Sequence, residues 1–245
     1  GSKYHNIKLR ELALKKHLYL NEYGINGKTF RTEKDLYNFL GMDYIPPELR
    51  EDNGEIQAAL EHKLPKLVEL KDIKGDLQMH TNFNLETSHD PGANSIEEMQ
   101  EKTKELGYSF IGITNHNPSS KINVLAKVKA QSNYIEELNS STKSVRVLNL
   151  LEVDINPLGE LAVSQEGLNL LDGCLVSIHS VFNLDKNKMT ERVLKGLSNP
   201  VARIFAHPTG RLLNQREGYE LDWDKIFTFC LEHNKALEIN AHPSR

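Results

Sequence analysis

The sequence has few cysteines and no long apolar run. Its 245 residues include two cysteines and one tryptophan, and Cys174 and Cys230 each stand in an apolar stretch. Cysteines in this setting are more typical of a buried core than of a disulfide or a metal pair. The absence of any run of about 18 apolar residues argues against a membrane-spanning helix. The opening residues do not show the pattern of a signal peptide, in which charged residues are followed by an apolar segment. We therefore expect a cytoplasmic protein with no membrane partner.

Basic residues are in the minority overall, but they gather near the start. The chain has 30 Lys and Arg against 34 Asp and Glu, a net charge of −4. Residues 1–40 hold eight basic and four acidic side chains, so they carry +4 and leave −8 for residues 41–245. This asymmetry suggests contact with a polyanion such as DNA, although a solvated helix face gives the same pattern. The candidate DNA contacts are Lys3, Lys8, Arg10 and Lys15.

The opening segment mixes helical and extended patterns. Asn6–His17 has the apolar spacing of a short amphipathic helix, and Leu18–Tyr23 has the composition of a strand. Thr32 and Asp35 form a capping pattern for a helix that ends at Gly41. Pro46 and Pro47 then favour an extended segment.

From residue 73 the chain alternates between strand and helix patterns. Such alternation predicts an α/β fold with a parallel sheet covered by helices. The expected strands are Ile73–Met79, Phe110–Thr114, Val145–Ile155, Cys174–Ile178, Arg203–Ala206 and Ala236–Asn240. The expected helices are Ser95–Leu106, Lys121–Asn139, Thr190–Leu197 and Trp223–His233, the first capped by Asn94-Ser95.

Five short blocks place an imidazole or a carboxylate at or just past the end of an expected strand. Imidazole nitrogens and carboxylate oxygens from several strand ends are what a site for several Zn²⁺ or Mn²⁺ ions needs. Barrels of alternating strands and helices carry their sites at that end. The blocks are Gly75–Thr81, Ile113–His116, Leu151–Asp154, Ser177–Ser180 and Ala206–Pro208.

These blocks resemble the motifs of the PHP (polymerase and histidinol phosphatase) domain. The family pattern reads Asp-Leu-His-x-His-Thr, Thr-Asp-His, Glu-Val-Asp, Ser-x-His and His-Pro-Thr-Gly-Arg. His207–Arg211 preserves the last motif, whereas Gln78 stands where the family has His and Asn115 where it has Asp. The resemblance implies a distorted seven-stranded (β/α) barrel. Because about six strands are expected here, we expect that barrel to be incomplete at its C-terminal end.

The opening segment is similar to the end of the thumb of family-X DNA polymerases, through Leu20–Gly24 and Ile45–Glu51 among other residues. Bacterial members join this thumb to a C-terminal PHP domain, in the order found here. The resemblance divides the chain into a small α+β thumb remnant (1–44), a linker with a connecting helix (45–72) and a PHP domain (73–245). It implies DNA and an upstream polymerase domain as partners, in a nucleoid-associated bacterial setting.

The resemblance also implies a set of metal ligands. Glu152, His179 and His207 would hold one ion, although a Glu at a barrel rim can also pair with Lys or Arg. His80 would hold a second ion, which would share Glu152 with the first. Gln78 would be a weak or altered ligand of this second ion. The family binds up to three Mn²⁺ or Zn²⁺ ions, and we expect fewer here.

A third ion would use His116 and an acidic residue from the loop after His80, for which we favour Asp90 over Glu86. It would also need a His from a C-terminal Asp-x-His that this chain lacks. Asn115 lacks the negative charge of the family's Asp, which could orient a metal ligand or bind the ion itself. Arg211 is a candidate phosphate clamp or, equally, a structural salt bridge. His242 is left out of the ligand set. The remaining histidines are assigned to the surface or to packing, and they are His5, His17, His62, His89 and His233.

The function implied by the resemblance is a metal-dependent phosphodiesterase that trims DNA 3′ ends during repair. Glu152, His179 and His207 would act through a metal-bound hydroxide. The altered Gln78, the altered Asn115 and the missing Asp-x-His predict impaired 3′–5′ exonuclease activity, and no polymerase palm is present. Two alternatives remain at this point. One is a degenerate domain kept as a structural or DNA-holding module, and the other is a small-molecule phosphatase of the histidinol-phosphatase type.

Overall fold

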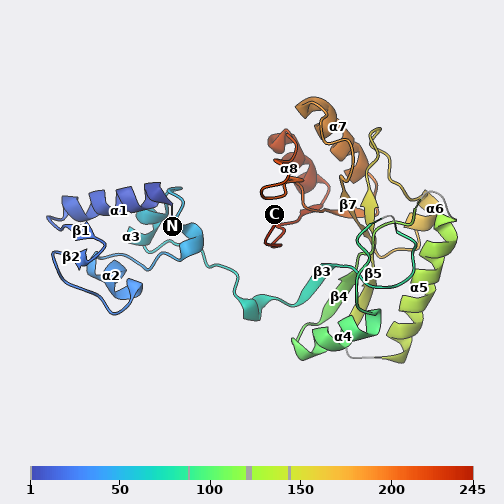
Figure 1. Cartoon of the computed structure of the whole chain (residues 1–245), viewed down its shortest axis with the longest axis horizontal. Helices are drawn as coiled ribbons and strands as arrows, with labels where there is room; N and C mark the ends of the chain where they lie inside the picture. Colours follow the sequence, from blue (N-terminus) through green and yellow to red (C-terminus); the bar gives the residue numbers. More distant parts are fainter. Residues whose placement is uncertain (1, 88, 120–122, 143–144, 245) are drawn as a thin grey trace. The chain divides into compact units, whose positions relative to one another are not determined.

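The computed structural model describes residues 2–87, 89–119, 123–142 and 145–244. The chain divides into two compact units, Gly1–Glu69 and Leu70–Arg245 (Figure 1). Each unit has its own hydrophobic core, so each is described separately. None of the helices in the described residues is long and apolar enough to cross a membrane.

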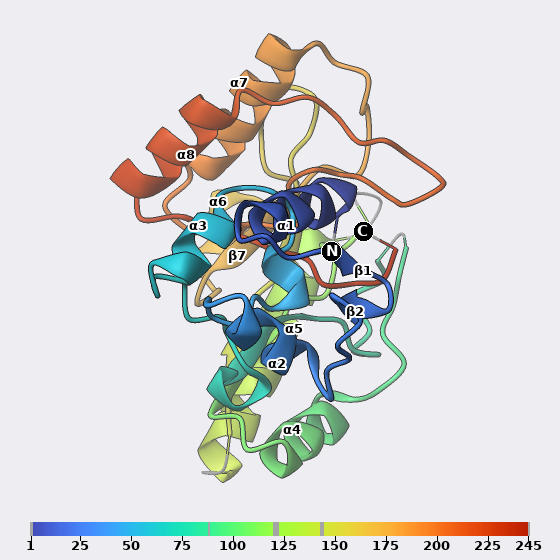
Figure 2. The same cartoon turned by 90° about the vertical axis from the view of Figure 1, so that its left-hand side faces the viewer.

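The first unit is a small α+β module (Figure 2). It contains α1 (Lys3–Lys15), a hairpin of β1 (Leu20–Asn21) and β2 (Gly24–Ile25), α2 (Glu33–Phe39), a 3₁₀ turn (Pro47–Leu49) and α3 (Glu55–Leu60). α1 begins earlier than the expected Asn6, because the Ser2 hydroxyl accepts a hydrogen bond from the His5 N–H at 3.2 Å. The predicted cap of α2 is confirmed as a reciprocal capping box between Thr32 and Asp35.

Residues from the expected linker pack into the core of this first unit. Ile45 and Ala59 are fully buried there, together with Tyr37 and Leu40 from α2 and its end. Burying these apolar side chains removes them from water, which stabilises the module. The first unit therefore extends well beyond residue 44.

In the described residues, the second unit contains seven parallel strands in two sheets. The first sheet has the order β3 (Gly75–Met79), β4 (Phe110–Ile113), β5 (Arg146–Asn149). The second has the order β6 (Glu152–Asp154), β7 (Cys174–Ser177), β8 (Ala202–Phe205), β9 (Ala236–Leu237). The α/β class with parallel strands is confirmed.

The resemblance implied a seven-stranded barrel, expected to be incomplete, and the strands of the described residues do not form a closed barrel. The predicted strand Val145–Ile155 breaks at Leu150 and Leu151 into β5 and β6, which belong to different sheets. Among the described residues, an isolated bridge between His116 and Glu152 joins the two sheets at that break. β9 has only two residues, and the strand pairs of the described residues do not join it to β3. The sheet therefore stays open.

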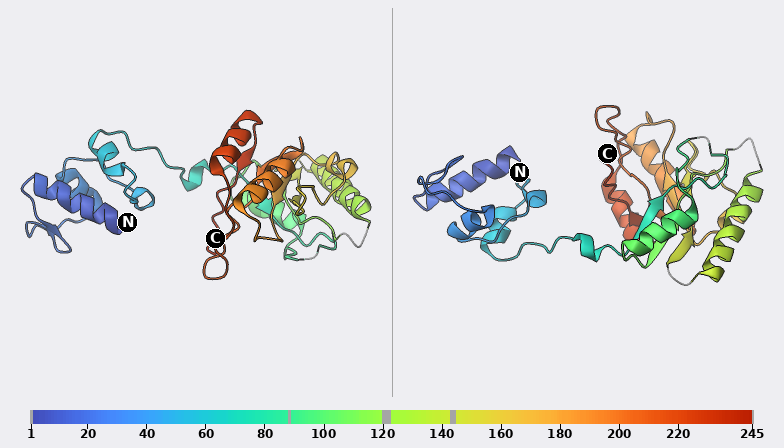
Figure 3. Two further views of the ribbon diagram at one scale, coloured as in Figure 1. Left: turned by 90° about the horizontal axis from the view of Figure 1, so that it is seen from above. Right: turned by 60° about the horizontal axis from the view of Figure 1, so that its bottom comes forward.

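Five α-helices of the described residues accompany the two sheets. They are α4 (Ile96–Glu105), α5 (Val124–Ser141), α6 (Gln165–Leu168), α7 (Lys186–Leu197) and α8 (Trp223–Glu232). Figures 1 and 3 show α4 and α5 in green beside the first sheet, and α7 and α8 in orange to red beside the second. The main core lies between β6–β8 and α7 and α8, with Val176, Val193 and Ile226 fully buried.

Helix starts follow local capping. Ser95 and Glu98 form the capping box of α4, as predicted. α7 begins at Lys186 rather than Thr190, because Asp185 accepts a hydrogen bond from the Lys188 N–H at 3.0 Å. Residues 120–122, where the start of the predicted helix Lys121–Asn139 falls, lie outside the described residues, and α5 is capped by Asn123.

Candidate metal centre

Glu152 lies at the point where the two sheets meet. Its backbone N–H donates to the Asn115 carbonyl at 3.1 Å, and its carbonyl accepts from the Asn117 N–H at 3.0 Å. These bonds tie the first residue of β6 to the segment that follows β4. The side chain is only 1% exposed, so its carboxylate needs compensating partners.

Two histidines that follow neighbouring strands lie close to one oxygen of this carboxylate. His207 Nε2, just past β8, lies 2.7 Å from Glu152 Oε1. His179 Nε2, just past β7, lies 3.2 Å from the same oxygen. The donor atoms of the three residues lie within 4.8 Å of one another. The predicted convergence of these residues is confirmed.

A second group surrounds the other oxygen. The Gln78 side-chain N–H donates to Glu152 Oε2 at 3.0 Å, and His80 Nε2 lies 3.5 Å from that oxygen. His116 Nδ1 lies 3.9 Å away, and its ring stacks on that of His80 at a centroid distance of 4.6 Å. His80, His116 and Glu152 thus form a second set that shares the carboxylate with the first.

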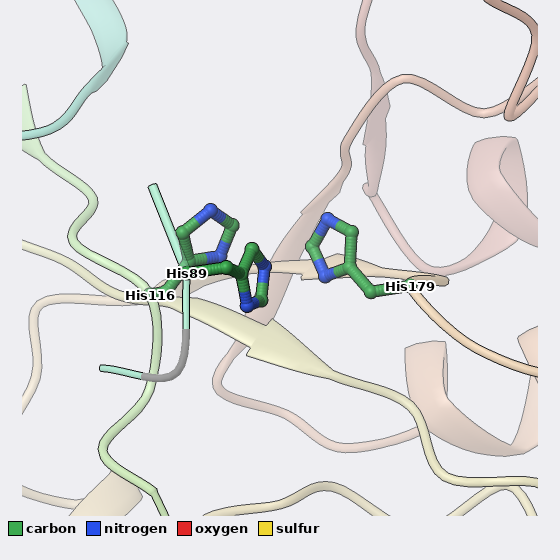
Figure 4. Close-up of side chains that lie close together, drawn as sticks. All are labelled: His89, His116 and His179. Carbon is green, nitrogen blue, oxygen red and sulfur yellow. The ribbon is translucent and has the colours of Figure 1, made fainter. Parts of the chain in front are cut away.

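His89 also reaches this centre, which sequence reasoning missed (Figure 4). Its ring lies 4.1 Å from that of His116 and 5.0 Å from that of His179, measured between centroids. The three imidazoles form a third set of potential ligands. Asp90 lines the same cavity, but none of the three sets found among the described residues includes it. The preceding Ser88 lies outside the described residues.

The signal for His89 was its position in the sequence. It lies in the same loop as Asp90 and Glu86, the two acidic candidates for the third ion. Imidazole is an equally common ligand for Zn²⁺. The local context was polar, and only the path of the loop brings the ring onto His116.

Asp154 orients His179, a role that the sequence did not assign. His179 Nδ1 lies 2.6 Å from Asp154 Oδ1 and 3.3 Å from the Ser177 hydroxyl. Because Nδ1 is engaged in this way, Nε2 is directed towards Glu152. A carboxylate behind a ligating imidazole is a recurrent arrangement at metal sites, where it fixes the ring and raises its basicity.

Asn115 is turned away from the carboxylate. Its Oδ1 accepts the Thr81 backbone N–H at 2.6 Å, and its Nδ2 donates to Gln131 Oε1 at 3.0 Å. Gln131 in turn donates to the Leu150 carbonyl at 3.1 Å. These contacts place Asn115 in a buried network that holds the residue after His80, rather than among the candidate ligands.

The charge states follow from burial and neighbours. Burial would raise the pKa of Glu152, but hydrogen bonds with His179 and His207 outweigh it and hold the pKa below its usual value. Burial is also the main reason that the pKa of His116 falls to about 4, which leaves that ring neutral. Burial opposes the charged form of His179, yet Asp154 and Glu152 raise its pKa to about 9.

The candidate ligands open into a cavity of about 700 Å³, large enough for a small ligand. Its lining includes Gln78, Glu152 and Glu238. Arg211 is not part of the lining formed by the described residues; it is exposed, and its backbone N–H donates to the Thr209 hydroxyl at 3.3 Å. The cavity can therefore present bound cations to an anionic substrate, and the phosphate clamp at Arg211 stays a prediction.

The donor set fits divalent transition ions. Gln78 Oε1 and His116 Nδ1, the latter 3.9 Å from Glu152 Oε2, are buried without a hydrogen-bond partner. Buried polar atoms without partners are rare and costly, and a cation satisfies such lone pairs. The mixture of imidazole with one central carboxylate suits Zn²⁺ and Mn²⁺.

Comparison with known families agrees with the site. Residues 76–242 match the model of the PHP domain, and residues 1–51 match the DNA polymerase beta thumb. The chain belongs to the PHP family. It joins a polymerase-type thumb to the PHP domain, as its motifs predicted.

Two relatives carry informative names. The whole chain is 38% identical over 254 aligned residues to the DNA polymerase/3'-5' exonuclease PolX of Bacillus subtilis, of which it matches the C-terminal part. It spans 43% of the length of that protein. It is also 26% identical, over 60% of its length, to a protein of Caldicellulosiruptor saccharolyticus named "Probable phosphatase", of which 59% is covered.

Proposed function

We propose that the PHP domain of this chain is a metal-dependent phosphodiesterase that removes nucleotides from DNA 3′ ends. The observation that carries this is the buried Glu152 carboxylate, met by His179 and His207 on one oxygen and by His80 and Gln78 on the other. The name of the Bacillus subtilis relative supports DNA 3′ ends as the substrate.

In this proposal, Glu152, His179 and His207 would hold one cation, and Glu152, His80 and His116 would hold a second. Asp154 keeps the His179 ring in the orientation that ligation needs. Mn²⁺ or Zn²⁺ bound there would neutralise charge on the phosphoryl oxygens and activate water for attack on phosphorus.

The protein groups have separate tasks. The cavity beside the ligands admits the end of a DNA strand, and its walls limit how the phosphodiester can lie. His116, kept neutral by burial, offers a lone pair at physiological pH. Four histidines around one buried carboxylate favour binding of cations over binding of a neutral substrate.

The test is release of nucleotides from a 3′-labelled DNA strand with Mn²⁺ or Zn²⁺, compared with a chelator. Glu152→Gln keeps the size of the side chain and removes the charge that both positions share. We expect it to lose metal and to reduce cleavage by several orders of magnitude, which corresponds to about 4 kcal/mol or more of lost transition-state stabilisation. Cleavage by Glu152→Gln at the rate of the unchanged chain would refute the proposal.

We also infer that Gln78 weakens the second cation position and so impairs catalysis. Its amide N–H donates to Glu152, where a ligating imidazole would instead present a lone pair. Gln78→His should raise Mn²⁺ affinity and Mn²⁺-stimulated cleavage, each by about tenfold or more. Unchanged affinity and rate in this variant would argue against impairment at Gln78.

The name of the Caldicellulosiruptor relative favours a second candidate, hydrolysis of small phosphomonoesters. The same ligands would serve that reaction, so substrate comparison decides between the two. Preferential cleavage of 3′-terminal phosphodiesters supports the nuclease, whereas faster hydrolysis of p-nitrophenyl phosphate or histidinol phosphate supports the phosphatase. Metal binding without either activity would leave the domain a structural or DNA-holding module.

A further inference from the structure

Another cavity lies at the end of the second sheet opposite to the metal centre. It has a volume of about 320 Å³ and forms where α7 ends, β8 begins and α8 ends. Arg203 lies on β8, four residues before His207, so the two are roughly 13 Å apart at about 3.3 Å per residue. The residues that line this basic cavity are Ser198, Pro200, Arg203, Phe229, His233 and Lys235.

The lining contains cations and, among the described residues, no acidic side chain. Arg203 is exposed, and its guanidinium makes no ion pair or hydrogen bond with another described residue. Lys235 is half-buried, and its Nζ donates to the Asn199 carbonyl at 3.0 Å and to the Ala202 carbonyl at 2.6 Å. An ammonium group has three donors, so within the described part of the chain one of them is left for a ligand.

Two positive charges lie close together here without an anion between them. Burial lowers the pKa of Lys235 most, and the charge of Arg203 lowers it further. The groups that act in the opposite direction are the thiols of Cys174 and Cys230, and burial raises the pKa of both, so they are neutral at pH 7. Bonds to two carbonyls at the end of α7 explain Lys235 alone. They give no reason for a second cation beside it, whereas a bound anion does.

We propose that the basic cavity binds a terminal phosphate group through Arg203 and Lys235. Such a group carries about −1.5 to −2 charge at pH 7, which two cations match, whereas a phosphodiester carries a single charge. The planar guanidinium suits two phosphate oxygens, and the ammonium group suits a third. Free phosphate, a nucleoside monophosphate and the 5′ end of a DNA strand all present this group. The rings of Phe229 and His233, 4.2 Å apart between centroids, add a surface on which a base can stack.

Calorimetric titration of the whole chain, residues 1–245, tests this site. Excess chelator in the buffer removes any contribution from cations at the metal centre. The probes are inorganic phosphate, deoxyadenosine 5′-monophosphate and the 3′,5′-cyclic diester of the same nucleoside. We expect one saturable site for the first two probes and binding of the cyclic diester that is weaker by about tenfold or more, because one charge is lost.

Arg203→Gln removes one of the two cations and leaves the fold intact, because Arg203 is exposed. It should lower the affinity for phosphate and for the monophosphate by about tenfold or more, since a hydrogen bond to a charged group is lost. Arg146→Gln is the matched control, because Arg146 is also exposed near the start of a strand, β5. It should leave both affinities unchanged, and both variants should unfold at the temperature of the unchanged chain.

The same titrations identify the source of the phosphate. Tighter binding of the monophosphate than of inorganic phosphate supports a nucleotide, and equal affinities support free phosphate. A short DNA strand that binds more tightly with a 5′ phosphate than without one, and loses this difference in Arg203→Gln, supports a DNA end.

Three results would overturn the site. They are equal phosphate affinities in Arg203→Gln and Arg146→Gln, equal affinities for the monophosphate and the cyclic diester, and binding that does not saturate. Glu152→Gln should leave the affinity in chelator unchanged, and a loss there would place the phosphate in the metal centre instead. The two cavities share no lining residue, so failure of the proposed nuclease leaves this inference standing, and the reverse also holds.

Discussion

At the scale of single residues, the Glu152 carboxylate is 1% exposed and its pKa lies below the usual value. Desolvation alone would have the opposite effect, so the surrounding imidazoles determine its charge state. The same carboxylate raises the pKa of His179 with the help of Asp154. Without metal, His179 is therefore protonated, and a cation that binds this ring nitrogen must displace the proton.

This arrangement predicts proton release on metal binding at pH 7. The pKa of His179 is about 9, above its ordinary value of 6.5, so the ring is protonated at pH 7 and its pairing with Asp154 is lost only as the pH rises through about 9. Asp154→Asn should lower that pKa and so reduce the fraction of a proton that His179 releases. Calorimetric titration in buffers of different ionisation enthalpy measures the number. Equal proton release in both proteins would contradict this assignment.

At the scale of elements, buried Arg192 of α7 holds two loops that bear site residues. Its guanidinium donates to the Ser180 carbonyl at 3.0 Å, next to His179, and to the Asn156 carbonyl at 2.8 Å, shortly after Asp154. It also donates to the carbonyls of Ile155 and Val181. One side chain thus fixes the ends of β6 and β7 relative to each other.

Arg192→Leu should destabilise the second unit by about 3 kcal/mol or more, because it removes a charged donor from several buried carbonyls. Urea unfolding in a chelator, followed by the fluorescence of Trp223, measures this change. Lys195→Leu on the same helix is the control and should stay within about 0.5 kcal/mol, since Lys195 is largely exposed. Equal stabilities of the two variants would show that Arg192 does not hold the loops.

The first unit contains a buried polar network of its own. Burial would raise the pKa of Glu55, but hydrogen bonds from His5 and from the Asp52 and Asn53 N–H groups lower it below 4.5. A lowered carboxyl pKa contributes stability above pH 4.5 that is lost as the pH falls through the folded-state value. The first unit should therefore lose stability below pH 4.5.

NMR signals of α1 and α2 in an acid titration of the whole chain report this loss. Glu55→Gln should weaken the dependence on pH, and at pH 7 it should cost about 1–3 kcal/mol because a buried charged acceptor is removed. An identical acid transition in the variant would place the responsible carboxylate elsewhere.

At the scale of the whole molecule, the chain joins a polymerase-type thumb to a PHP domain. The basic residues proposed to contact DNA are all exposed on α1, but they form two pairs. Lys3 and Arg10 are seven residues apart and share one side, while Lys8 and Lys15 lie about 140° around the helix. Lys8 also pairs with Asp52 at 2.5 Å, which reduces its availability for phosphate.

We therefore expect Lys3 and Arg10 to matter more for DNA. Changing both to Glu should weaken duplex binding and lower the slope of log affinity against log salt by roughly 1.8, or about 0.9 for each lost phosphate contact. The matched control changes Lys102 and Lys104 of α4, which already pair with Glu105 and Glu101. Equal affinity and slope in the two double variants would refute DNA binding by α1.

The sequence alone determined the class of the fold and most of the centre. Strand patterns ending in His or Glu indicated parallel strands whose ends meet, because parallel strands present their carboxyl ends at one edge. This reasoning correctly brought Glu152, His179 and His207 together. Capping at Thr32 and Ser95 was also predictable, since it depends on residues three positions apart.

Tertiary structure decided what depends on distant contacts. The predicted strand Val145–Ile155 is divided between two sheets because β5 and β6 pair with different neighbouring strands. Local composition does not indicate which strands will pair. Asn115 turns to Thr81 and Gln131, and His89 reaches His116, because loops fold back over long separations in sequence. Residue type sets which chemistry is possible, whereas the paths of the loops decide which of those side chains share a cation.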